Sequence, residues 1–175
     1  IYQELSSTSK TSLATDSTAK TGIGTTTPTQ KLDVVGSIAI PTTIDSTSGV
    51  IYKGTARFIH NFALAGTNGF NTFVGLNAGN FTMTGSTMGQ GSSNSALGVN
   101  ALQANTTGYQ NSAMGMYALY SNTTGYSNSA MGFYAGRYIA DGSTANATST
   151  NSLYLGYDTR ALASGDTNEI VIGAS

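Results

Sequence analysis

The chain has 175 residues, which is room for one ordinary domain and a tail. Only 9% of the residues are charged and the formal net charge is −1, so no nucleic-acid-binding surface is expected. The lack of cysteine excludes disulfides and zinc–thiolate sites, and no apolar run is long enough to predict membrane insertion. A hydrophobic content of 39%, with 22 glycines and ten tyrosines, favours a turn-rich all-β fold.

Residues 1–21 are polar and rich in serine and threonine, with two isolated leucines, Leu5 and Leu13. Such a segment cannot build a core of its own. We therefore expect an extended N-terminal assembly segment that makes inter-subunit contacts, either by adding a strand to a sheet edge or by wrapping around an assembly axis.

Residues 22–70 carry two stretches in which apolar residues alternate with other residues. The first stretch contains Leu32, Val34, Ile38 and Ile40, and the second contains Phe58, His60, Phe62 and Leu64. A period of two predicts half-buried strands, so we expect a β entry segment rather than an enzyme domain. Gly22-Ile23-Gly24 is only half of a dinucleotide fingerprint, and Pro28 follows where a helix would open, so no cofactor is expected.

A repeated unit occupies residues 71–175. Asn94–Gln110 (NSALGVNALQANTTGYQ) and Asn111–Ser127 (NSAMGMYALYSNTTGYS) are identical at 11 of 17 positions. The equivalent glycines, which we interpret as repeat-turn residues, are Gly75, Gly98, Gly115, Gly132, Gly156 and Gly173. Their spacings of 23, 17, 17, 24 and 17 indicate a 17-residue unit with two insertions, one within 81–93 and one within 138–150.

Each unit contains two short apolar runs, such as Ala113-Met114 and Ala118-Leu119, and the Asn-Thr-Thr-Gly sequence separates one unit from the next. We predict that each unit is one coil of a parallel β-solenoid: strand, tight turn, strand, looser turn. Alanine and glycine dominate the expected inward positions, so the core of a single chain would be thin. A thin core favours oligomerisation.

The tyrosines are the most interesting candidate site residues. Tyr109 is equivalent to Tyr126, and Tyr117 is equivalent to Tyr134, so stacked coils would place each pair in a column. One interpretation is packing between coils or chains, with the hydroxyls hydrogen-bonded. The other is an aromatic strip that contacts a sugar or cell-surface polymer.

Titratable residues are few. No acid, lysine or arginine occurs from Phe58 to Gly136, so no catalytic residues are expected. The later acids, Asp141, Asp158, Asp166 and Glu169, are interpreted as turn residues or, alternatively, as a carboxylate or Ca²⁺ site. His60 is the only histidine and is either an ordinary packed or surface residue or, in a trimer, one of three copies that bind a metal ion or an anion on the axis. No metal site within one chain is expected.

Four asparagines open N-x-S/T sequons, namely Asn80, Asn105, Asn122 and Asn146. They are interpreted either as turn residues or as glycosylation acceptors.

The N-S-A-L/M-G-x-x-A-L/G units resemble the left-handed β-roll repeats of YadA-like trimeric autotransporter adhesin heads. They are still more similar to related repeats in bacteriophage tail-fibre proteins and bacterial surface fibre proteins. Residues 22–36 (GIGTTTPTQKLDVVG) resemble the entry motif of fibre proteins that carry a C-terminal self-cleaving chaperone domain. The resemblance implies a homotrimer with an intertwined hydrophobic axis and a role in attachment.

These observations lead to one expected function and two alternatives. We expect a structural and adhesive subunit of an extracellular trimeric fibre, of the tail-fibre type, that is not an enzyme and has no cofactor. Its partners would be other copies of itself, polymerising into a fibre, with cell-surface glycans as further candidates. The first alternative is a bacterial cell-surface filament or adhesin subunit. The second is a glycan-binding or polysaccharide-degrading β-solenoid.

Overall fold

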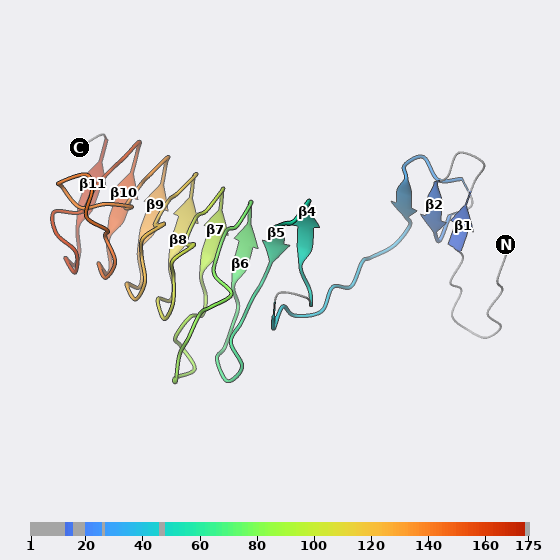
Figure 1. Ribbon diagram of the computed structural model, residues 1–175, viewed down its shortest axis with the longest axis horizontal. Coiled ribbons are helices and arrows are strands. Elements are labelled where there is room, and N and C mark those ends of the chain that lie inside the picture. The colour runs from blue at the N-terminus through green and yellow to red at the C-terminus, as the bar shows by residue number, and fades with distance from the viewer. Residues whose placement is uncertain (1–12, 16–19, 26, 46–47, 174–175) are drawn as a thin grey trace. The chain divides into compact units, whose positions relative to one another are not determined.

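The structure is a computed structural model that describes residues 13–15, 20–25, 27–45 and 48–173. All regular structure in these residues is β, and none of them is helical, as the composition predicts. The chain divides into two compact units, Ile1–Ile40 and Pro41–Ser175 (Figure 1). Most of the predicted N-terminal assembly segment, residues 1–21, lies outside the described residues.

The first unit holds a three-stranded sheet. Strand β2 (Thr21–Ile23) pairs antiparallel with β1 (Leu13–Thr15) and parallel with β3 (Leu32–Val34). The carboxylate of Asp33 on β3 accepts hydrogen bonds from the backbone N–H and the hydroxyl of Thr29, which lies before the strand, and these bonds lower the pKa of Asp33.

The long strand predicted through Ile40 is wrong, because β3 ends at Val34. Two residues later Gly36 adopts a φ of 134°, which takes the backbone out of the extended conformation. Ile38 and Ile40 follow in irregular structure and remain exposed.

The second unit holds an eight-stranded sheet in which the strands follow one another in chain order (Figure 1). Strands β4 (Ile51–Lys53) and β5 (Ala56–His60) form an antiparallel hairpin, and β5 also pairs antiparallel with the next strand. The second predicted strand therefore ends at His60 rather than Leu64, because the backbone N–H of Phe62 donates to the His60 ring and not to a neighbouring strand.

The remaining strands are parallel and fall once in each repeated unit. They are β6 (Thr72–Val74), β7 (Ser95–Leu97), β8 (Ser112–Met114), β9 (Ser129–Met131), β10 (Leu153–Leu155) and β11 (Ile170–Ile172). Ala96 is paired with Ala113, and Ala113 with Ala130, so the 17-residue repeat is also the register of the sheet. Each of the six equivalent glycines directly follows one of these strands, with φ between 92° and 140°.

The second predicted strand of each unit is a turn. Leu102 and Leu119 have φ values of 54° and 47°, in the left-handed region, so the backbone cannot run on as a strand. Neighbouring units are nevertheless bonded here, because the N–H of Leu119 donates to the carbonyl of Ala135 at 2.9 Å. The unit therefore has one strand, and a tightly wound return path that bonds to the next return path.

The core is thin, as the repeat composition predicts. Of the fourteen buried hydrophobic residues in the described chain, eight are alanines. The six larger buried side chains are Phe62, Phe73 and Met83 near the start of the parallel strands, Leu102 and Leu119 in the return paths, and Tyr154 on β10. The central units therefore bury little apolar side-chain volume, and apolar burial alone stabilises them only weakly.

A row of buried asparagines compensates for the thin core. Asn94, Asn111 and Asn128 occupy the residue before successive strands and have almost no exposed surface. The Oδ1 atom of Asn94 accepts from both the backbone N–H and the Nδ2 of Asn111, each at 3.1 Å. Asn111 and Asn128 repeat this arrangement, Asn71 precedes it, and Ser152 follows it. We call this row the asparagine ladder.

A second pair of buried asparagines joins the ladder to the Asn-Thr-Thr-Gly turns. The Nδ2 of Asn122 donates to the Oδ1 of Asn105 at 3.2 Å. The carbonyl of Gly108 accepts from Asn94 and Asn105, and the carbonyl of Gly125 accepts from Asn111 and Asn122. Each turn is thereby bonded to an asparagine of its own turn and to one of the ladder.

Replacing Asn111 with Ala should destabilise the chain by roughly 3–4 kcal/mol, because the buried N–H of Asn128 and the carbonyl of Gly125 lose partners. Urea unfolding would measure the change. The matched control is Asn68→Ala, at an exposed asparagine, which should change stability by no more than about 0.5 kcal/mol. Equal effects of the two substitutions would contradict a stabilising ladder.

The glycine after each strand is required both by conformation and by space. At Gly115, φ is 139° and a Cβ atom would overlap the carbonyl oxygen of Gly132 in the next unit. We expect Gly115→Ala to cost at least roughly 3 kcal/mol. Gly89→Ala is the control, because a Cβ atom there meets nothing within 4 Å. If thermal melting shifted equally in both variants, the close approach of successive units would not be a constraint.

Candidate functional site

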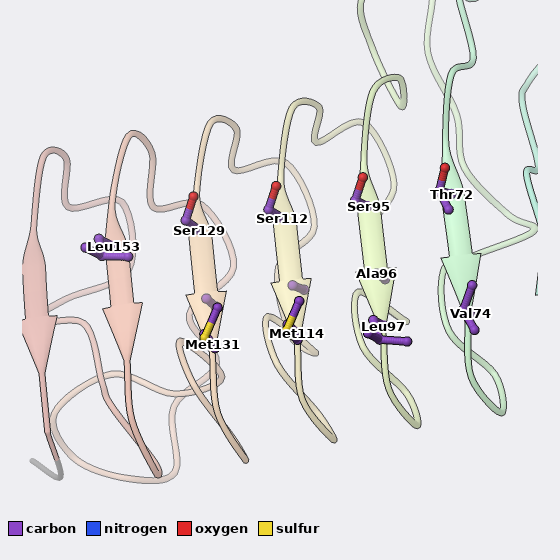
Figure 2. A pocket seen from close by; sticks show the side chains of 12 residues that line it. Thr72, Val74, Ser95, Ala96, Leu97, Ser112, Met114, Ser129, Met131 and Leu153 are labelled. Carbon is purple, nitrogen blue, oxygen red and sulfur yellow. The ribbon is translucent and has the colours of Figure 1, made fainter.

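The open face of the parallel sheet is the most extensive candidate site. Each strand has three residues, of which the middle one is buried on β7, β8 and β9 and the outer two face away from the core. The first positions form a row of hydroxyls, made by Thr72, Ser95, Ser112 and Ser129. The third positions form an apolar row, made by Val74, Leu97, Met114, Met131 and Leu155. Figure 2 shows the two rows side by side from β6 to β9.

From β6 to β9 the two rows, with Leu153 and the alanines between the rows, line a shallow groove of about 450 Å³ that contains no charged side chain. Leu97, Met114 and Met131 are 49%, 48% and 50% exposed, so about half of each side chain remains in contact with water. A contiguous exposed apolar strip of this kind marks an interaction surface. Because no titratable group lines the groove, it can bind an apolar surface but offers no acid or base.

The apolar character of this face increases toward β11. The first position of β10 is Leu153 and that of β11 is Ile170, in place of the earlier hydroxyls. Ile170 and Ile172 are both largely exposed. The serine row therefore gives way to a second apolar row over the last two strands.

Sequence reasoning identified Ala113-Met114 as an apolar run but missed that its two residues face opposite ways. The alternation of serine, alanine and methionine over one strand carries that signal, because successive strand residues point to opposite faces. In a strand of only three residues, an alternation with a period of two cannot be recognised from the sequence of one unit.

The predicted tyrosine columns have different geometries. Tyr109 and Tyr126 are stacked, with ring centroids 4.7 Å apart and an angle of 3° between the planes. Tyr117 and Tyr134 meet edge to face, with centroids 5.3 Å apart and an angle of 70°. Tyr126 is partly exposed, so the stacked pair both packs between units and presents an aromatic surface to solvent.

His60 is packed inside the chain. Its Nε2 donates to the carbonyl of Ala78 at 2.8 Å, and its Nδ1 accepts from the N–H of Phe62 at 3.3 Å. The ring lies 4.9 Å from Phe73 and 4.5 Å from Phe81, centroid to centroid. Burial lowers the His60 pKa to about 4; the Ala78 hydrogen bond opposes the shift and the charge of Arg57 adds to it. Neither nitrogen is left for an ion shared between chains.

The later acids are held by neighbouring groups. Asp141 accepts hydrogen bonds from the N–H and hydroxyl groups of Thr144 and Ser143, which lower its pKa to about 2. Asp158 is paired with Arg160. Asp166 caps the N–H of Ala163, and Glu169 accepts from the Tyr154 hydroxyl and from the N–H of Leu162. In the part of the chain that the structure describes, no group of three or more His, Asp or Glu could hold a metal ion.

Three of the four sequon asparagines have a structural role. Asn105, Asn122 and Asn146 are buried, so their amides are not accessible to a glycosylating enzyme in the folded chain. Asn80 is partly buried, and its Nδ2 donates to the backbone carbonyl of Asn105 at 2.8 Å. These contacts favour the turn interpretation at all four positions.

Comparisons of the chain with known protein families, with curated proteins and with solved structures found no match. The described residues include no helix of the length and apolarity needed to cross a membrane. The functional argument therefore depends on the residues and geometry given above.

The unfolding free energy should depend on pH through His60. The ring binds a proton at pH 6.5 when unfolded but only at about pH 4 when folded, so acid favours the unfolded chain. Above pH 6.5 neutral His60 makes its whole contribution to the unfolding free energy. As the pH falls from 6.5 to 4, the unfolding free energy decreases by up to roughly 3 kcal/mol.

Denaturant unfolding between pH 7.5 and 4 would measure this loss. The control is His60→Phe, which keeps an aromatic ring between Phe73 and Phe81 but cannot titrate. Its stability should fall less steeply with acid than that of the parent chain, and equal slopes would show that His60 is not responsible.

Proposed function

We propose that the chain is a structural and adhesive subunit of an extracellular attachment fibre of the tail-fibre type. In this proposal residues 71–175 form a left-handed parallel β-roll, and three copies associate through the open faces of their sheets. The observation that carries the proposal is the uncharged apolar row of Val74, Leu97, Met114, Met131 and Leu155. The Leu97, Met114 and Met131 side chains at its centre are about half exposed in a single chain.

Hydrogen bonding between units supports the β-roll. Successive strands pair in register, and the return paths also bond from one unit to the next, as the N–H of Leu102 does to the carbonyl of Ala118. Both sides of a unit are thus used by its neighbours, which is the arrangement expected of stacked coils.

The composition of the face supports self-association rather than binding of a charged partner. Burying the exposed half of one Leu or Met side chain contributes about 1 kcal/mol. Bringing chains together costs about 4–15 kcal/mol in lost freedom, so one or two such residues would not hold a trimer. A row that repeats on every strand and on each of three chains can exceed that cost, and the gain grows with the number of units.

The remaining surface supports an attachment role. The long stretch from Phe58 to Gly136 presents hydroxyl, amide and aromatic groups but no acid, lysine or arginine. Such a surface can hydrogen-bond to neutral sugars without charge repulsion, and the stacked Tyr109–Tyr126 pair offers an aromatic platform for a sugar ring. The proposal assigns the chain no catalytic role. A cell-surface filament built from the same units would use the same face and the same surface.

Replacing Met114 with Glu should dissociate the trimer without unfolding the chain, because a carboxylate at the centre of the apolar row would be buried without a partner. Sedimentation velocity would measure the mass, which we expect to fall from three chains to one. Circular dichroism would verify that the variant keeps its β content.

The matched control is Met88→Glu. Met88 lies outside the sheet and is 69% exposed, so the same substitution should leave the mass unchanged. A parent protein that sediments as a single chain would overturn the trimer proposal, and so would a Met114→Glu variant that remains trimeric.

A further inference from the structure

One guanidinium lies among four tyrosine rings in the turns that follow β8 and β9. The Cζ atom of Arg137 is 4.6 Å from the ring centroid of Tyr117, 4.7 Å from Tyr120, 4.4 Å from Tyr134 and 4.6 Å from Tyr138. These distances are within the range of favourable cation–π contact. All five residues keep part of their surface in solvent. We call them the Arg137 cluster.

Arg137 has no anionic partner within the described chain. The one ion pair given by these residues joins Arg160 to Asp158, and no hydrogen bond joins the Arg137 guanidinium to another described residue. Its Nε atom is buried and lacks a hydrogen-bond acceptor, as do the Nε atoms of Arg57 and Arg160, so an external ligand would bind the terminal nitrogens. The side chain keeps part of its surface in solvent, so a guanidinium that no described carboxylate neutralises can bind an anionic partner from outside the chain.

The backbone indicates that the tyrosines are present for their side chains. Tyr117 and Tyr134 have φ values of 61° and 62°. The equivalent positions of other units hold Asn77, Asn100 and Asp158, with φ between 48° and 57°. Asparagine and aspartate adopt this left-handed conformation readily, whereas its conformational free energy is higher for a bulky residue. The turn alone would therefore favour asparagine at both tyrosine positions.

We propose that the Arg137 cluster binds the carboxylate of an acidic sugar, of the uronic acid class. The planar guanidinium matches a carboxylate in charge and in geometry. The tyrosine hydroxyls and exposed ring edges provide the polar and apolar contacts that a pyranose needs.

The charge of the site favours a carboxylate over a phosphate. Arg137 is the first charged residue after 79 uncharged positions, and the next cation, Arg160, is already paired with Asp158. A single available cation suits a ligand with one negative charge, whereas a phosphate monoester carries nearly two at neutral pH.

This inference deepens the attachment role proposed above and rests on it. The site is nevertheless built within one chain, so binding and assembly can be tested separately on the same sample.

Binding should be measured by titration calorimetry with hexameric oligogalacturonate and with its fully methyl-esterified form, which has the same sugars without the charge. We expect the parent chain to bind the free acid at least ~10-fold more tightly than the ester, the effect of one charged hydrogen-bonded pair. Arg137→Met should abolish that preference. The control Lys53→Met, which removes a positive charge from β4, should retain it.

A second variant separates binding from folding. The double substitution Tyr117→Asn and Tyr134→Asn introduces the turn residue of neighbouring units, so the chain should fold with an unchanged β spectrum while binding to the acid weakens at least ~10-fold. The proposal would be overturned if the folded parent chain did not bind the acid, or bound acid and ester with equal affinity. It would also be overturned if inorganic phosphate competed for the site as strongly as the acid itself does. A trimer that ignores the acid would overturn this site alone, and a single chain that binds it would overturn the trimer alone.

Discussion

The parallel stack depends on the asparagine ladder. Alanine-sized side chains occupy most of the interior, so dispersion and apolar burial cannot by themselves hold a strand of three residues in register. Asn94, Asn111 and Asn128 supply directional bonds instead: each side chain accepts from the backbone of the next unit and donates to the carbonyl of a turn. A displacement of one residue would break these bonds and turn the buried alanines outward. The ladder thus sets register where packing is too weak to do so.

The short length of the strands also explains the exposed face. A strand of three residues that buries only its middle side chain leaves the other two turned toward solvent, and here at least one of those two is apolar on every parallel strand from β6 to β11. Charged residues at those positions would make a single chain more soluble in water. With leucine and methionine and no charged side chain along the groove, this face is suited to contact another apolar surface.

The sequence predicted the period, the parallel strands and the thin core, because the recurrence of Asn-Ser-Ala-Met-Gly is the register of the sheet. It did not reveal the turn at Ala118-Leu119, since leucine carries no signal for a left-handed backbone and its φ is imposed by bonds to the next unit. The ladder was missed because an asparagine beside serine also suits an exposed turn, and only burial distinguishes a buried asparagine from an exposed one. The groove and the Arg137 cluster combine residues from several units, so their geometry became visible only once the register was known.

Because the register of the sheet is 17 residues, the stack can lengthen or shorten only by whole 17-residue units. Each unit bonds to the one before it and the one after it through nearly the same atoms, so removing or duplicating Asn111–Ser127 would join equivalent partners. A deletion of any other small number of residues would misplace the ladder, the alanines and the glycines together. The stack can therefore gain or lose whole units while the exposed face, the ladder and the turns of each remaining unit stay the same.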